Sequence, residues 1–189
     1  MIRYDNVMKN HHKHNQNLIL FGYKGSGKSF FGKLLGEKLQ IKFIDTDLLI
    51  EKSYEEKFSI QASCREIFVK LGESGFRQLE SEIVHDLDME TKAIIAVGGG
   101  TLLNMANFYK LKEMGKLVYL EVSKEIIKKR IFESGIPPFL DEKDPEYSFE
   151  KMYEERKPLY EKIEAFKIKI DEKSTEEIMD ILKIHHDDL

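Results

Sequence analysis

The chain has 189 residues, of which 41% are apolar and 34% are charged, a composition typical of a soluble protein with one sizeable core. Its net charge of −4 argues against general binding to nucleic acids or anionic membranes, and no apolar run approaches the ~18 residues that span a bilayer. The single cysteine, Cys64, excludes an internal disulfide, which fits the reducing cytoplasm where we expect the protein to be located.

The first fifteen residues are polar and include His11, His12 and His14. Such a tract can bind a metal ion weakly, but we favour a solvated, flexible tail for residues 1–15. We therefore expect residues 16–189 to form a single domain, and all elements below are taken from that range.

A short apolar strand is predicted at Asn17–Phe21, and a glycine-rich segment follows it directly. Residues 22–29 read Gly-Tyr-Lys-Gly-Ser-Gly-Lys-Ser, which matches the pattern G-x-x-x-x-G-K-[ST] of the phosphate-binding P-loop. The motif requires this position between a strand and a helix. A helix is indeed predicted next, because one face carries the apolar residues Phe31, Leu34, Leu35 and Leu39.

The P-loop predicts a binding site for a nucleoside triphosphate. Its glycines let successive backbone N–H groups turn toward phosphate oxygens, and the start of the following helix adds a partial positive charge. Lys28 can reach the β- and γ-phosphates, and the hydroxyl of Ser29 can bind Mg²⁺. An ordinary glycine-rich turn is the alternative interpretation, and spacing and context together disfavour it.

Two carboxylates follow the second predicted strand, which spans residues 41–44. Asp45 and Asp47 are two residues apart, so their side chains point the same way if the strand continues that far. One carboxylate can orient Mg²⁺ and its waters, while the other accepts a proton from a substrate hydroxyl. The alternative is that both merely cap a helix that begins near Leu48, but the neighbouring P-loop favours a functional pair.

Arg77 lies one turn into a helix that is predicted to start near Glu73. Glu80 follows three residues later, and the apolar face of the helix consists of Phe76, Leu79, Ile83 and Leu87. An arginine–glutamate pair at this spacing is usually a surface contact of little energy. From the residues alone, that interpretation is preferred.

Three consecutive glycines, Gly98, Gly99 and Gly100, follow the third predicted strand at residues 93–97. Bare backbone lets a small ligand approach closely and bond to N–H groups. A tight turn needs one or two glycines, so three in a row favour a binding function. Because ligands bind beyond the carboxyl ends of parallel strands, we expect the P-loop, the aspartates and these glycines to converge.

Residues 131–148 follow the fourth predicted strand, at residues 117–120, and its helix. This segment contains three prolines and several acidic residues, and it lacks both strand and helix patterns. We expect a mobile loop there, which is a candidate lid over the site.

Arg156 lies in the next helical pattern, whose apolar face consists of Phe149, Met152, Tyr153 and Tyr160. An arginine on this inward face is costly unless it is paired, so a clamp for a carboxylate or phosphate is one interpretation. A buried ion pair and a snorkelling side chain are the alternatives. A half-exposed strand is predicted at residues 166–170, and the last helix opens with a capping box at Ser174 and Glu177.

Five strands that alternate with helices predict an α/β fold with a parallel sheet. Taken in order, the motifs resemble the shikimate kinase family from Asn17 to the C-terminal helix. The shared features are the P-loop at 22–29, Phe-Ile-Asp-Thr-Asp at 43–47 followed by Ile50 and Glu51, Gly72 and Glu73 with Phe76, Arg77 and Glu80, the glycines at 98–100, and Arg-Lys-Pro-Leu-Tyr at 156–160.

The resemblance implies a P-loop kinase fold, a three-layer sandwich whose five-stranded parallel sheet has the order 2-3-1-4-5 between helices. It also implies transfer of the γ-phosphate of ATP to the 3-hydroxyl of shikimate, a step of aromatic amino-acid biosynthesis. The expected partners are ATP, shikimate and Mg²⁺, with no nucleic acid and no membrane, and we expect a monomer.

Roles for individual residues follow from the same resemblance. Lys28 and Asp47 are the expected catalytic residues, and Asp47 also binds the ring hydroxyls. The expected Mg²⁺ ligands are Ser29 and Asp45. The expected ATP-binding residues are Gly25, Ser26, Gly27, Lys28, Ser29, Phe30 and Arg130, the last packing on adenine. The expected shikimate-binding residues are Asp47, Gly98, Gly99, Gly100, and the two arginines that hold its carboxylate, Arg77 and Arg156.

The chain departs from the family pattern at two places. Many members carry a lid arginine that reaches the ATP phosphates, and Pro137 occupies that position here. Either Lys143 substitutes for the arginine, or the chain belongs to a subgroup with another lid design. A few extra residues also occur around residues 61–64, near the expected substrate.

Two other functions are each compatible with part of the sequence. Another small-molecule or nucleotide kinase of the same fold would share the P-loop without the remaining motifs. A non-catalytic, ATP-binding regulatory protein would fit the missing lid arginine, but retention of Lys28, Ser29, Asp45 and Asp47 argues against it.

Overall fold

The computed structural model describes residues 17–88 and 92–187. The tail expected at residues 1–15, with His11, His12 and His14, lies outside the described residues. No helix of the described ranges is both long enough and apolar enough to cross a bilayer.

Five parallel strands form one sheet in the order β2-β3-β1-β4-β5, which confirms the order implied by the family resemblance. The strands are β1 (Asn17–Phe21), β2 (Lys42–Asp45), β3 (Ala93–Ala96), β4 (Gly115–Glu121) and β5 (Phe166–Lys169). Helices connect the successive strands, as parallel pairing requires. They are α1 (Lys28–Leu39), α2 (Thr46–Phe58), α3 (Cys64–His85), η2 (Thr101–Leu103, a 3₁₀ turn), α4 (Met105–Met114), α5 (Lys124–Glu133), α6 (Pro145–Lys162) and α7 (Thr175–Asp187).

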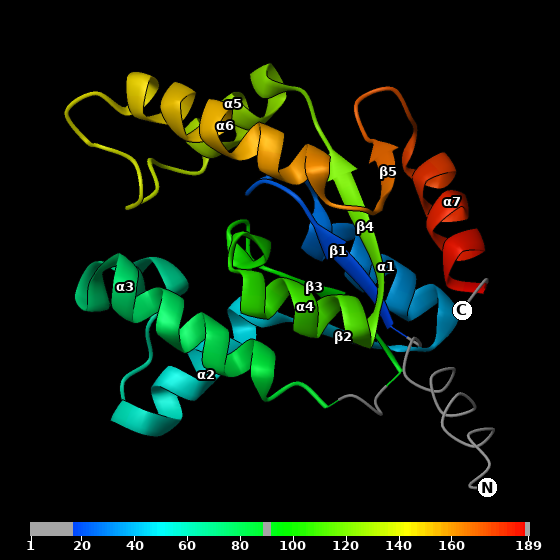
Figure 1. The fold of residues 1–189 in the computed structure, drawn as a ribbon, viewed down its shortest axis with the longest axis horizontal. Helices are drawn as coiled ribbons and strands as arrows, with labels where there is room; N and C mark the ends of the chain where they lie inside the picture. Colours follow the sequence, from blue (N-terminus) through cyan, green and yellow to red (C-terminus); the bar gives the residue numbers. More distant parts are fainter. Residues whose placement is uncertain (1–16, 89–91, 188–189) are drawn as a thin grey trace, which may run out of the picture.

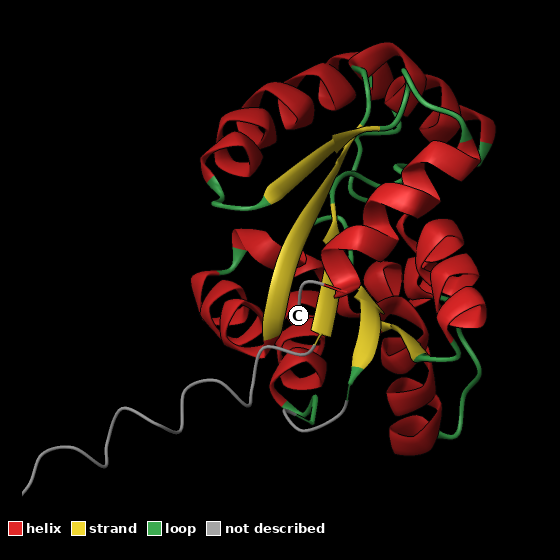
Figure 2. Cartoon of the chain, turned by 90° about the vertical axis from the view of Figure 1, so that its right-hand side faces the viewer, coloured by secondary structure: helices red, strands yellow, loops and turns green. Residues whose placement is uncertain are grey.

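Helices cover both faces of the sheet, so the predicted three-layer sandwich is confirmed (Figures 1 and 2). Helices α1 and α7 contact each other and β1 on one face, while α4 packs on β4 from the other face. Helix α3 packs against α4 and against α2, outside the sheet. This arrangement leaves the carboxyl ends of the strands open toward α3 and α6.

The apolar interior is divided into two clusters of unequal size. The main core surrounds the sheet and includes every residue of β1 after Asn17, which is buried because helices cover both faces. A second cluster, the α2–α3 core, consists of Ile50, Tyr54, Ile67, Phe76 and Leu79. The P-loop therefore follows a strand of the main core, whereas the helices that carry Asp47 and Arg77 share the smaller core.

Two expected boundaries need revision, and both revisions have a local cause. Gly72 is not helical, with φ 69° and ψ 174°, so a helical segment does start near Glu73 as expected. A further helical segment that was not expected precedes it: α3 begins at Cys64, because Ser63 and Glu66 form a capping box. The candidate lid is shorter than residues 131–148, since α5 continues to Glu133 and α6 begins at Pro145, so the loop spans 134–144.

The start of α6 shows why the prolines were misleading. Pro145 occupies the first turn, where a missing N–H costs nothing, and the carboxylate of Asp144 accepts a hydrogen bond from the Tyr147 N–H at 3.1 Å. The capping box predicted for the last helix is confirmed, because the Ser174 N–H donates to Glu177 at 2.7 Å and the Glu177 N–H donates to the Ser174 hydroxyl at 3.2 Å.

Candidate active site

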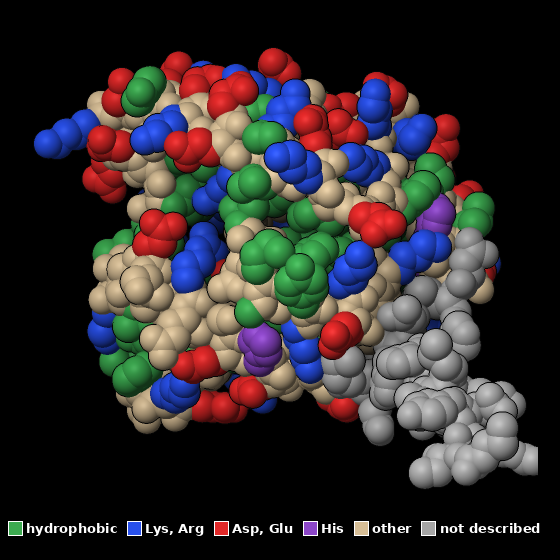
Figure 3. Space-filling model, in the orientation of Figure 1, with side chains coloured by type: hydrophobic (Ala, Val, Ile, Leu, Met, Phe, Trp, Pro, Cys, Tyr) green, Lys and Arg blue, Asp and Glu red, His purple; other side chains and the backbone are tan. Residues whose placement is uncertain are grey.

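A cavity of about 800 Å³ opens at the carboxyl ends of the strands, where the sequence motifs were expected to converge. Figure 3 shows the molecule hollowed between the α5–α6 region and α3, with basic side chains at the edge of the hollow. The expected site residues that line this cavity are Gly25, Gly27, Lys28, Ser29, Phe30, Asp45, Asp47, Arg77, Gly98, Gly99, Gly100, Arg130 and Arg156.

Ser26 is the exception among the expected site residues, because it does not line the cavity. Its side chain is fully buried, and a Cβ atom at Gly22 would lie 3.0 Å from its hydroxyl oxygen. The hydroxyl therefore faces the interior, and only the backbone of Ser26 is available to a ligand of the loop.

The P-loop has the backbone geometry that phosphate binding needs. Gly25 and Gly27 have φ angles of 84° and 90°, which side-chain-bearing residues rarely adopt. The ammonium of Lys28 donates to the carbonyls of Gly22 at 3.0 Å and Tyr23 at 2.9 Å, so it is held over the loop. Burial lowers the pKa of Lys28 to about 8, although Asp47 and Asp45 oppose this shift, and the lysine remains mostly cationic at neutral pH.

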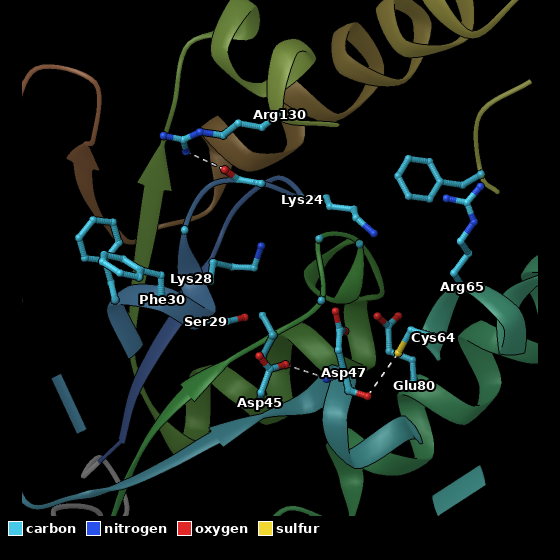
Figure 4. Close-up of a pocket in the computed structure, with 18 of the residues that line it drawn as sticks. Lys24, Lys28, Ser29, Phe30, Asp45, Asp47, Cys64, Arg65, Glu80 and Arg130 are labelled. Carbon is cyan, nitrogen blue, oxygen red and sulfur yellow. Dashed lines mark hydrogen bonds between the residues drawn. The ribbon is translucent and has the colours of Figure 1, made fainter. Parts of the chain in front are cut away.

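Arg130 reaches back to the P-loop from α5. Its guanidinium donates to the Gly25 carbonyl at 2.8 Å, and a Cβ atom at Gly25 would lie 3.3 Å from the Cβ of Arg130. Figure 4 shows this contact above the loop. Arg130 therefore lies beside the P-loop and lines the cavity next to it.

The three glycines form a turn, in which the Thr101 N–H donates to the Gly98 carbonyl at 3.2 Å, and each glycine also lies in close contact with other site residues. A Cβ atom at Gly98 would lie 2.8 Å from the Glu80 carboxylate, and one at Gly99 would lie 2.9 Å from the backbone nitrogen of Lys24. At Gly100 the clash would be with the Arg77 guanidinium at 2.7 Å. Any side chain in this segment would therefore displace a wall of the cavity.

Asp45 and Asp47 both line the cavity but occupy different structural positions. The strand ends at Asp45, whose carboxylate caps α2 by accepting a hydrogen bond from the Asp47 N–H at 3.0 Å. The capping interpretation therefore holds for Asp45 in addition to its place at the site. Asp47 lies in the first turn of α2, where its side chain faces the cavity (Figure 4).

Asp47 combines access to solvent with a raised pKa. The cavity gives its side chain contact with water, but the surrounding protein and the Asp45 charge raise its pKa to about 6, against the opposing charge of Lys28. A carboxylate with this pKa is deprotonated at neutral pH and is a stronger base than an ordinary aspartate. Asp47 can thus accept a proton from a hydroxyl group in the cavity.

Arg77 and Glu80 form a partly buried ion pair rather than the surface contact that the residues alone favoured. The guanidinium lies 2.9 Å from the Glu80 carboxylate, whose side chain is only 1% exposed. The Thr101 hydroxyl donates to the second Glu80 oxygen at 2.7 Å. Glu80 therefore fixes Arg77 against the wall of the cavity, and 28% of the Arg77 side chain stays exposed to meet a ligand.

Arg156 lies on the inward side of α6, as its spacing predicted. Its guanidinium is 5.6 Å from the ring centroid of Phe139, a residue of the loop 134–144. The neighbouring Tyr160 hydroxyl donates to the Gly99 carbonyl, and burial raises its pKa to about 12 despite Arg156 and Arg77. Among the described residues Arg156 forms no ion pair, so the alternative of a buried ion pair is not observed there.

Several residues of the cavity were missed by sequence reasoning. Lys24, Cys64 and Arg65 line it, whereas Lys143, the suggested substitute for a lid arginine, does not. The Cys64 thiol lies 3.3 Å from the Asp47 carbonyl, and burial together with the Asp47 and Glu51 charges raises its pKa, so it is a poor nucleophile. The position of α3 was the missing information, because its true start brings Cys64 and Arg65 to the cavity.

Comparisons with known proteins agree with this geometry. The family model "Shikimate kinase" matches residues 24–185. A shikimate kinase of Microcystis aeruginosa is 40% identical over 143 residues, which cover 76% of this chain and 72% of the relative. A shikimate kinase of Alkaliphilus oremlandii is 37% identical over 166 residues, which cover 87% of this chain and 95% of the relative. The solved structure of a shikimate kinase from Acinetobacter baumannii in complex with shikimate has a TM-score of 0.78 and 29% identity, covering 91% of this chain and 93% of that chain.

Proposed function

This chain belongs to the shikimate kinase family, and from that premise we propose that it transfers the γ-phosphoryl group of ATP to the 3-hydroxyl of shikimate. The observation that carries the proposal is one cavity lined by the P-loop, by the carboxylate of Asp47 and by the two arginines Arg77 and Arg156. Transfer to an alcohol acceptor needs both parts within one water-excluding site.

The nucleotide is held by the P-loop in this proposal. Backbone N–H groups of residues 25–29 bind the phosphates, and Lys28 exchanges its contacts with the loop carbonyls for contacts with the β- and γ-phosphate oxygens. Arg130 packs on the adenine from α5, and Phe30 adds apolar surface at the same end of the cavity.

The oxygen donors beside the P-loop fit Mg²⁺. Ser29 and Asp45 both line the cavity, and Asp45 uses only Oδ1 for its cap, which leaves Oδ2 available. Within residues 17–88 and 92–187 no cluster of three His, Cys, Asp or Glu forms a complete metal cage, but Mg²⁺ at kinase sites binds one or two protein oxygens together with substrate phosphates and water. Bound there, Mg²⁺ would neutralise phosphate charge.

The acceptor is positioned by the other end of the cavity. Arg77 and Arg156 hold the carboxylate of shikimate with paired N–H donors, and Gly98, Gly99 and Gly100 present bare backbone to its ring. Asp47 takes the proton of the 3-hydroxyl while that oxygen forms its bond to the γ-phosphorus and ADP departs. The products are shikimate 3-phosphate and ADP.

The loop 134–144 is the proposed lid. Pro138 and Phe139 already line the cavity, and the loop reaches out over α3 (Figure 1). Closure over bound substrates would exclude water, which limits wasteful hydrolysis of ATP. All residues proposed to bind ATP or shikimate come from one chain, so we expect an active monomer. We also expect the protein to be located in the cytoplasm.

Release of ADP from Mg·ATP tests the function directly. It is measured with no acceptor and with shikimate, quinate, gluconate or nucleoside monophosphates. We expect rapid release that depends on shikimate. Release that requires another acceptor would contradict the proposed substrate, and no release from protein that binds ATP would instead support a regulatory role.

A further inference from the structure

Some basic side chains of the cavity form hydrogen bonds or ion pairs within the protein, and others do not. They are Lys24, Lys28, Arg65, Arg77, Arg130, Arg156 and Lys173. Lys28 and Arg130 bond to P-loop carbonyls, and Arg77 is paired with Glu80. Among the described residues, the side chains of Lys24, Arg65 and Lys173 make no hydrogen bond or ion pair, although all three line the cavity.

Lys24 starts from a rigid position inside the P-loop. The preceding residue, Tyr23, stacks on Tyr153 with ring centroids 4.8 Å apart and donates to the Tyr153 carbonyl at 3.0 Å. On the other side, Gly99 packs so closely that a Cβ atom there would lie 2.9 Å from the backbone nitrogen of Lys24. The backbone is therefore fixed between α6 and the triple glycine, and only the side chain is free to move.

The Lys24 side chain points to the centre of the cavity. It extends from the loop toward the space above Asp47 and Glu80 (Figure 4). Its charge lowers the pKa of both Lys28 and Asp47, so its ammonium lies within electrostatic reach of the phosphate-binding lysine and of the proposed base. A phosphoryl group in transit between ATP and the acceptor passes between those two residues.

The loop 134–144 contributes no cation to the cavity. Its only basic residue, Lys143, does not line the cavity, and the loop contributes Pro138 and Phe139 instead. Arg65 is turned toward this loop, since its guanidinium lies 3.3 Å from where a Cβ atom of Gly135 would be. Lys24 is therefore better placed than Arg65 or Lys143 to meet a transferring phosphoryl group.

We propose that Lys24 is a catalytic residue that binds the γ-phosphoryl oxygens in the transition state, in addition to Lys28. The P-loop of this chain thus supplies a second cation from the rigid side of the cavity, without help from the lid. A cation at this point neutralises charge on the oxygens of the transferring group and is worth orders of magnitude in rate. The inference rests on the proposed phosphoryl transfer to shikimate.

Lys24→Met tests the inference, because methionine keeps the length of the side chain and removes its charge. We expect kcat with shikimate to fall by about 10²- to 10³-fold, while the Kd for ATP, measured by direct titration, changes by less than about threefold. Lys24→Arg keeps the cation and should retain kcat within about tenfold. Lys183→Met, on the exposed surface of α7 away from the cavity, is the matched control and should behave as the wild type.

The outcomes separate this inference from the function on which it rests. A wild-type protein without shikimate-dependent turnover contradicts the proposed function itself. Normal wild-type turnover with an unchanged kcat for Lys24→Met overturns the role of Lys24. Equal losses of ATP affinity and kcat also overturn it, because they indicate binding of the ground state. A large loss in Arg65→Met together with an active Lys24→Met would assign the cation to Arg65 instead.

Discussion

The two ends of the cavity are built in different ways. The P-loop follows β1, whose apolar residues are all buried in the main core. Lys28 of the loop donates hydrogen bonds to carbonyls of the loop itself. Asp47 and Arg77 instead extend from helices that share the small α2–α3 core, and the remaining wall comes from α6 and the loop 134–144. The nucleotide end is thus preformed, whereas the acceptor end is assembled from separate elements.

This difference has a functional consequence. Phosphate binding needs fixed N–H groups, which a tight loop next to a buried strand provides before any ligand arrives. Acceptor binding needs selectivity and exclusion of water, which elements that can close on the ligand provide. Substitutions at the two ends should therefore affect different kinetic constants, and the following variants test that separation.

The largest effect is expected at the nucleotide end. Lys28→Met removes the buried cation over the loop, so kcat should fall by at least about 10³-fold and the Kd for ATP should rise. Initial-rate kinetics and nucleotide titration measure the two quantities. Retention of even a tenth of wild-type kcat would contradict the role of Lys28, and unchanged shikimate affinity in the variant would sharpen the separation of the two ends.

Asp47→Asn should give the next largest effect. The amide cannot accept the hydroxyl proton, so kcat should fall by about 10²- to 10⁴-fold while the Kd for ATP stays close to that of the wild type. Single-turnover kinetics and nucleotide titration measure these quantities. If ATP affinity fell by the same factor as kcat, Asp47 would belong to the nucleotide end, and the proposed separation of the two ends of the cavity would be contradicted.

A smaller effect, on one substrate only, is expected for Arg156→Lys. Lysine cannot form two parallel bonds to a carboxylate, so the KM for shikimate should rise by about 10- to 100-fold, with little change in the KM for ATP. Lys151→Ala, on the exposed face of the same helix, is the control. An unchanged KM for shikimate would remove Arg156 from the carboxylate clamp.

The mildest perturbation is a change of pH. Because the pKa of Asp47 is raised to about 6, the base is lost by protonation as pH falls through that value, and kcat/KM for shikimate should decrease about tenfold per pH unit below it. A pH–rate profile of the free enzyme measures this midpoint. The residual activity of Asp47→Asn should lack this limb, and persistence of the same midpoint in that variant would assign it to another group.

The sequence predicted the preformed end better than the assembled end. The P-loop is a contiguous motif, and the fully buried strands β1 and β3 were recognisable because a parallel strand covered on both faces is largely apolar. The motif did not show that the Ser26 side chain turns inward, so that only its backbone can meet a ligand.

At the acceptor end, tertiary contacts decided the outcome. Arg77 looked like a surface residue because nothing in the local pattern shows that Glu80 is buried beside Thr101. Lys24 and Arg65 were missed because neither position has a pattern of its own, and their function depends on what lies across the cavity. The prolines near residue 145 indicated a loop, yet one of them starts a helix.

One measurement tests the separation of the two ends most directly: titration of ATP and of shikimate into the wild type, Lys28→Met and Arg156→Lys, by calorimetry in the presence of Mg²⁺. We predict a crossed result, in which Lys28→Met weakens ATP binding alone and Arg156→Lys weakens shikimate binding alone. Weakening of both ligands by each variant in equal measure would show that the cavity is not divided in this way and would contradict the account.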